Sequence, residues 1–100
     1  MRRERVYDGA VPRAPFSVSE CLGAFHASQR DWHRDMAEAH REHGHAEAER
    51  QHRAAAAAHE AAMATPMDPF SAQVAMQASN RADQASQAAG VKVSTDWPPG

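Results

Sequence analysis

The pattern of hydrophobic and polar positions has a helical period from Val18 to about residue 64. Apolar residues recur at spacings of three and four, which place them along one side of an α-helix. In heptad terms, the alternating a and d positions of a coiled coil fall at residues 22, 25, 29, 32, 36, 39, 43 and 46. The pattern therefore predicts a helix over residues 18–64 with a single apolar stripe.

Signals for the two ends of this helix are clear in the sequence. Ser17 and Glu20 have the spacing of a capping box, in which each side chain accepts a hydrogen bond from the other residue's backbone amide. Pro66 ends the helix, because the residue before a proline is pushed out of the α region. Gly44 costs about 1 kcal/mol relative to alanine inside a helix and is also suited to a helix C-terminus. Two alternatives therefore stay open: one continuous helix, or a break at Gly44 that yields three helices.

A second helix is predicted over residues 69–89. Asp68 and Pro69 fit the N-cap and first-turn positions, and Gly90 supplies a stop. The expected fold is all-α, a helical hairpin over residues 17–89 in which a long helix packs against a shorter antiparallel one. An extended arm rich in Arg and Pro precedes the hairpin over residues 1–16, and a tail follows over residues 90–100.

The two predicted helices differ in length, and this difference predicts an interface. A continuous helix over residues 18–64 would span about 70 Å, and one over residues 69–89 about 31 Å. The short helix would leave the bulky apolar residues of the first stripe bare, and such patches mark binding surfaces. His43 lies on the same stripe, either as a polar residue that sets the register or as a solvated side chain. The predicted interface comprises Leu22, Phe25, Trp32, Met36 and His43.

The amino-acid composition also predicts that the protein associates with a partner. Leu, Ile, Val and Phe together make up only 10 of the 100 residues, and the abundant alanine contributes little side-chain area to a core. A sparse core favours stabilisation by a second copy of the chain or by a protein partner.

Charge and targeting signals narrow the partners further. A net charge of −2 gives no general attraction to nucleic acid or to anionic membranes. No apolar run approaches the roughly 18 residues of a membrane span, and the chain begins with a charged segment instead of a secretory signal. We therefore expect a location in the cytoplasm or within a macromolecular assembly, without secretion by a signal peptide.

The histidines form the main candidate site. They recur every seven residues at positions 26, 33 and 40 and again at 45, 52 and 59. On one continuous helix the first three flank the apolar stripe, whereas the second three lie nearly opposite it and face water. A metal site is the alternative, because Glu-x-x-His spacings put two ligand atoms on one side of a helix. Its candidate ligands are Glu42, His45, Glu49 and His52.

A response to pH is a further hypothesis, because histidine titrates near neutral pH. It would act through His43, if that side chain were buried between helices.

Motifs for catalysis are absent from the sequence. It contains neither a glycine-rich phosphate loop nor a nucleophile elbow, and Cys21 falls on the apolar face as a packed side chain. We therefore expect a non-enzymatic helical interaction or assembly protein without a cofactor. An accessory or structural subunit, such as a small component of a phage particle, is one example. The alternative is a metal-binding or pH-responsive helical oligomer rich in His and Glu.

Overall fold

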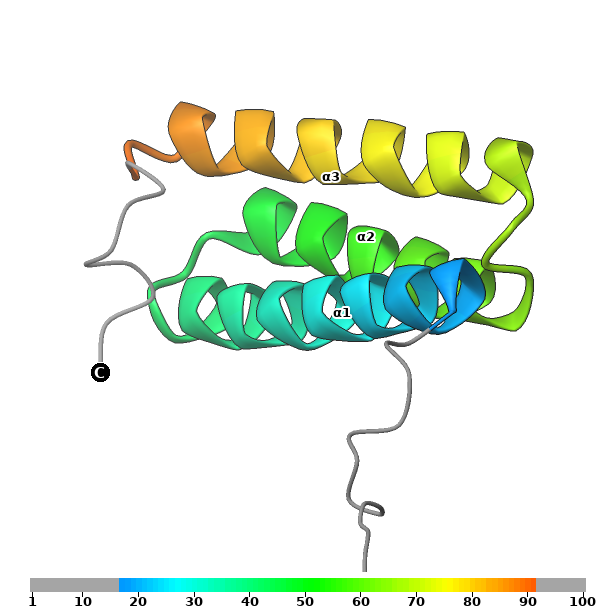
Figure 1. Ribbon diagram of the computed structural model, residues 1–100. Helices are drawn as coiled ribbons and strands as arrows, with labels where there is room; N and C mark the ends of the chain where they lie inside the picture. The colour runs from blue at the N-terminus through cyan, green and yellow to red at the C-terminus, as the bar shows by residue number, and fades with distance from the viewer. Residues whose placement is uncertain (1–16, 92–100) are drawn as a thin grey trace, which may run out of the picture.

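A computed structural model describes residues 17–91 and contains three helices in that range, which confirms the all-α prediction. They are α1 (Val18–Glu42), α2 (Ala46–Ala64) and α3 (Pro69–Ala88). Figure 1 shows α1 and α3 on either side of α2, with each helix antiparallel to the next in the chain. The backbone of α2 packs against both neighbours, whereas α1 and α3 meet only through side chains. The predicted arm and most of the predicted tail lie outside the described residues.

Gly44 breaks the long predicted helix. Helix α1 ends at Glu42, and Gly44 adopts a φ of 77°, a left-handed conformation that glycine reaches without a steric penalty. The His45 amide donates to the His40 carbonyl at 2.8 Å and closes the turn. The chain then reverses, so that α2 folds back on α1. The continuous helix over residues 18–64 does not form, and the three-helix alternative is confirmed.

The other predicted helix ends are confirmed. The Ser17 hydroxyl accepts from the Glu20 amide at 3.1 Å, and the Glu20 carboxylate accepts from the Ser17 amide at 2.9 Å. At the start of α3, Asp68 accepts from the Phe70 amide at 3.1 Å, with Pro69 in the first turn. Gly90 follows the end of α3 with a φ of 85°.

Little of the interior consists of large apolar side chains. Within the described residues, the fully buried apolar side chains are Met36 and a set of alanines. The alanine cluster between α2 and α3 comprises Ala55, Ala78 and Ala82, with Ala58 packed against it. Small side chains let these two helices approach closely. The remaining buried volume is filled by polar side chains, mostly imidazoles.

Charged residues lie on the outer surface. Arg34 pairs with Glu60 at 2.8 Å, and Arg53 pairs with Glu38 at 3.4 Å, so both pairs join α1 to α2. Exposed pairs of this kind each contribute about 0–1 kcal/mol. None of the three described helices combines the length and the apolar character that crossing a bilayer requires.

Candidate functional site

Histidines from two opposed segments meet between the three helices. Helix α1 supplies His26, His33 and His40, which share one face because seven residues make about two turns. The α1–α2 turn and α2 supply His45, His52 and His59 with the same spacing. Because α2 runs antiparallel to α1, the two sets pair in reverse order. Five of these six side chains are at most 2% exposed, and His45 is half-buried.

Each pair is joined through its Nδ1 atoms. The Nδ1–Nδ1 distance is 2.8 Å in the pair His26–His59, 2.8 Å in His33–His52 and 2.9 Å in His40–His45. At such distances one ring donates its N–H and the other accepts on its lone pair. The two neutral members of a pair must therefore be opposite tautomers.

Two serines of α3 join the pairs to one another. The Ser79 hydroxyl lies 3.0 Å from His33 Nε2 and 2.8 Å from His59 Nε2. The Ser86 hydroxyl, seven residues further along α3, lies 2.8 Å from His40 Nε2 and 2.7 Å from His52 Nε2. All eight side chains thus form one hydrogen-bonded line, which we call the histidine chain. Its order is His26, His59, Ser79, His33, His52, Ser86, His40 and His45.

Stacking between successive pairs reinforces the line. The rings of His33 and His59 lie 5.8 Å apart at an interplanar angle of 17°, and those of His40 and His52 lie 5.3 Å apart at 20°. A neutral imidazole has one donor and one acceptor nitrogen, and a hydroxyl can donate once while it accepts. The line therefore satisfies its buried polar groups without any net charge. Leaving one such group unpaired would cost about 1–3 kcal/mol, so the chain also specifies how the helices align.

Burial makes these imidazoles poor bases. Desolvation, together with repulsion from neighbouring rings, lowers the pKa of His33 to about 4, of His52 to about 3 and of His59 to about 4. Desolvation also lowers the pKa of His26 and of His40. In the folded protein at neutral pH the buried part of the histidine chain is therefore uncharged.

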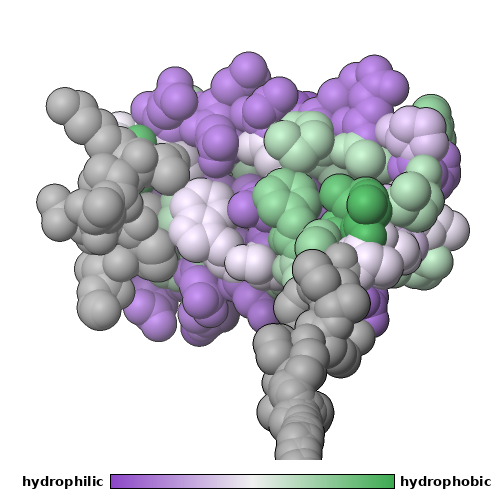
Figure 2. Space-filling view, viewed as in Figure 1, coloured by the Kyte–Doolittle hydropathy of each residue, from purple (hydrophilic) through white to green (hydrophobic). Residues whose placement is uncertain are grey.

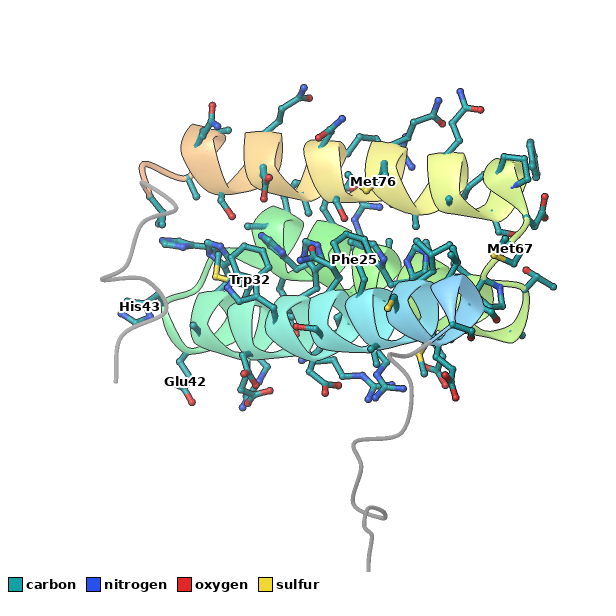
Figure 3. The ribbon with its side chains drawn as sticks, in the orientation of Figure 1. Phe25, Trp32, Glu42, His43, Met67 and Met76 are labelled. Atoms are coloured by element: carbon teal, nitrogen blue, oxygen red, sulfur yellow. The ribbon has the colours of Figure 1, made fainter. Side chains whose placement is uncertain are left out.

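Two aromatic side chains of α1 cover the chain on its open side. The Trp32 ring meets His33 edge-on at 4.9 Å and His52 at 5.9 Å. Phe25 meets His26 at 5.3 Å in the same manner. Figure 3 shows both aromatic residues on the side of α1 that faces α3. Their position limits the access of water to the imidazoles.

The fold buries some residues of the predicted interface and leaves others exposed. Met36 is fully buried inside the chain, because α2 folds back over it, so the expectation that it would be bare is wrong. Leu22 and Trp32 are half-buried, and Phe25 is exposed. His43 is exposed at the end of α1, where its Nδ1 lies 2.9 Å from the Ala39 carbonyl oxygen. It is not buried between helices, so the condition on which a pH response through this residue depended is not met.

The candidate metal ligands do not converge on one point. Glu42 is exposed at the last position of α1, and Glu49 accepts a hydrogen bond from Arg53 at 3.0 Å. The Nδ1 atoms of His45 and His52 face other imidazoles. Across residues 17–91, no group of three or more His, Cys, Asp or Glu side chains is arranged to hold a metal ion.

The seven-residue spacing of the histidines is visible in the sequence, but the burial of both sets between the helices is not. On a continuous helix, the histidines at 45, 52 and 59 would face water; the reversal at Gly44 turns them onto α1 instead. The signal for the serines was also present, since Ser79 and Ser86 have the same seven-residue spacing. Cys21, which was expected to pack on the apolar face, is exposed.

Imidazole and hydroxyl groups each can donate one hydrogen bond and accept another, so the histidine chain has the hydrogen-bonding pattern through which protons can be passed. Comparisons with known proteins add no function to this picture: no protein family, curated protein or solved structure matches the chain.

Proposed function

We propose that this protein is a non-enzymatic helical module whose folding responds to pH through the histidine chain. One observation carries the proposal: both ring nitrogens of His33, His52 and His59 bond to another imidazole or to a serine. None of these bonds goes to a carboxylate, which would stabilise the protonated form. Protonation of these rings therefore opposes folding.

The direction of the effect follows from the lowered pKa values. In the unfolded chain a histidine titrates near 6.5, whereas His33, His52 and His59 in the folded chain do so near 4 or below. Below pH 6.5 the unfolded state thus binds more protons, and stability falls as the pH falls toward 4. Three such groups give a slope of about 4 kcal/mol per pH unit near pH 5. Small domains are stable by only about 5–15 kcal/mol, so opening is expected between about pH 6 and pH 4.

Circular dichroism at 222 nm, followed from pH 8 to pH 4, tests this proposal. We expect a cooperative loss of helix on acidification that reverses on neutralisation. The variant His43→Gln serves as the matched control, because this exposed histidine lies outside the chain, and its transition should coincide with that of the natural protein. Helix content that stays constant down to pH 4 would contradict the proposal.

A second proposed function is protein–protein interaction, and a different observation favours it. Large apolar side chains are exposed on α3 and at the start of α1. In Figure 2 apolar residues gather in a central band of the face that α1 and α3 share, with hydrophilic residues on both sides. Phe25 on α1 and Met76 on α3, labelled in Figure 3, are 42% and 46% exposed, and Phe70 at the start of α3 is 71% exposed. Contiguous apolar patches of this kind commonly bind other proteins.

We propose a second copy of the chain as the first partner to test, with a role as an accessory or structural subunit in the cytoplasm or in a larger assembly. Light scattering after size exclusion at pH 7.5 should show a dimer or higher oligomer. The double variant Val74→Ser, Met76→Gln should shift the protein toward the monomer, because it removes apolar area without touching the histidine chain. The exposed, polar Gln84→Ser supplies a control on the same helix. A monomeric natural protein across the micromolar range would rule out self-association.

A further inference from the structure

The histidine chain has a direction. Each neutral imidazole in it has one N–H and one lone pair, so a ring that accepts on one side must donate on the other. The hydroxyls of Ser79 and Ser86 have no hydrogen-bond partner in residues 17–91 other than the imidazoles, so each accepts from one ring and donates to the next. Fixing the direction of one bond therefore fixes all the others.

The two possible directions differ in a simple way. In one direction the histidines of α1 carry their proton on Nδ1, while His45, His52 and His59 carry theirs on Nε2. In the other direction the two sets exchange tautomers. The assignment follows from the atoms that face one another, Nδ1 to Nδ1 within pairs and Nε2 to serine between pairs.

We infer that the histidine chain is a proton relay that connects His45, beside the α1–α2 turn, with His26 near the opposite end of α1. The inference rests on the proposed pH response, because both use the same eight side chains. Its ligand is a single proton from water.

The transfer can be followed bond by bond. When His45 donates to His40, the Nε2 of His45 has the lone pair, and the transfer begins when this nitrogen receives a proton that originates from hydronium. His45 then passes its Nδ1 proton to His40, and His40 passes its Nε2 proton to Ser86. Ser86 passes its own hydroxyl proton to His52, and the same steps repeat through Ser79 to the far end. His26 gains a proton on Nδ1 and releases the one on Nε2 to a water molecule, so one proton enters, one leaves, and each bond broken is matched by one formed.

The relay carries one excess proton at a time. A protonated imidazole donates from both nitrogens, so the bonds on either side of it point away. With two protonated rings in one pair, two N–H groups would face each other without an acceptor. With two protonated rings further apart, the bonds between them would converge on a neutral imidazole or a hydroxyl that has to accept twice. A neutral imidazole cannot accept twice, and a hydroxyl that did so would lose the acceptor for its own proton. After one transfer the direction of the chain is reversed, so the next proton passes the opposite way.

The charged and titratable groups near the relay come from all three helices. On the side of α3 that faces the other helices, the charged residue nearest in sequence to Ser79 and Ser86 is Asp83. It follows Ser79 by about one helical turn. Its Oδ1 atom is buried without a hydrogen-bond partner, and burial raises the pKa of this carboxyl group. From α1 and α2, Arg34, Glu60 and Arg53 point outward and pair with one another or with Glu38 and Glu49. The ring of His43 lies 6.1 Å from that of His45.

The tautomers of the six histidines test the relay. Long-range proton–nitrogen NMR of the full-length chain, labelled with ¹⁵N-histidine, measures at pH 8 the fraction of each ring that is protonated on Nδ1. The relay predicts one common fraction for His26, His33 and His40 and its complement for His45, His52 and His59. This relation holds whether one direction dominates or both exchange rapidly. Unrelated fractions, or the Nε2 tautomer throughout, would overturn the relay.

Two variants at Ser79 test whether this serine connects the pair His26–His59 to the rest of the histidine chain. Ser79→Thr keeps the hydroxyl and should keep the relation between the tautomers, whereas Ser79→Ala should uncouple the pair His26–His59 from the rest. An unchanged relation in Ser79→Ala would also overturn the relay. Failure of the relay is distinguishable from failure of the proposed function: acid unfolding without coupled tautomers removes the relay alone, and coupled tautomers without acid unfolding remove the pH response alone.

Discussion

The core of this small helical protein is unusual because it contains five buried imidazole side chains. Imidazole is large and flat enough to stack and pack, and it has two ring nitrogens through which a line of hydrogen bonds can pass without a charge. His33 and His52 use both nitrogens in this way while they are at most 1% exposed. The protein, which has one leucine and no isoleucine, thus has a largely polar core, whose stability depends on every member having its partner.

This dependence predicts the effect of removing one ring. The variant His52→Leu leaves His33 Nδ1 and the Ser86 hydroxyl each without one partner. Each orphaned group costs about 1–3 kcal/mol, so the free energy of unfolding at pH 7.5 should fall by about 2–4 kcal/mol in urea denaturation followed by circular dichroism.

The double variant His33→Leu, His52→Leu supplies the control. Because it removes both partners of the central pair, its loss of stability should be smaller than the sum of the two single losses, and its stability should depend less steeply on pH. Additive losses with an unchanged pH slope would show that the two rings act only as packing.

At the scale of helices, the turn at Gly44 decides which side chains meet. The capping box at Ser17, the N-cap at Asp68 and the stop at Gly90 could be predicted from sequence, because each is a local signal with its own backbone hydrogen bonds. The break at Gly44 could not be decided, because a local cost of about 1 kcal/mol is smaller than what tertiary contacts contribute. The break brings the histidines of α1 and α2 together, and no local pattern in the sequence shows these tertiary contacts.

Two glycines of similar surroundings test the role of this turn. At neither Gly44 nor Gly23 would an added Cβ come within 4 Å of an atom beyond the adjacent residues and the local helix backbone, but only Gly44 of the two has a positive φ. Gly44→Ala should lower the melting temperature, with a loss of about 1 kcal/mol, because alanine is strained in that conformation. Gly23→Ala, inside α1, should raise stability by about 0.5–1 kcal/mol. Equal shifts of the same sign in calorimetry would be inconsistent with a left-handed turn at Gly44.

For the whole molecule, the histidine chain ties three helices together. Helices α1 and α3 have no backbone contact, so the bonds from Ser79 and Ser86 to the α1 histidines help to hold them in place. The same arrangement leaves an apolar face open beside the histidine chain, and Phe25 of that face contacts the rings of His26 and His59. Association on this face would further limit the access of water to the imidazoles, so the proposed pH response and the proposed association would reinforce each other.

The most direct measurement is an NMR titration of the buried histidine signals in the intact protein. If the chain is uncharged when folded, the ring signals of His33, His52 and His59 should keep constant chemical shifts from pH 8 down to the onset of unfolding. They should then disappear together as the helices open. A gradual shift of these signals with a midpoint near pH 6.5, in a protein that stays folded, would contradict the account.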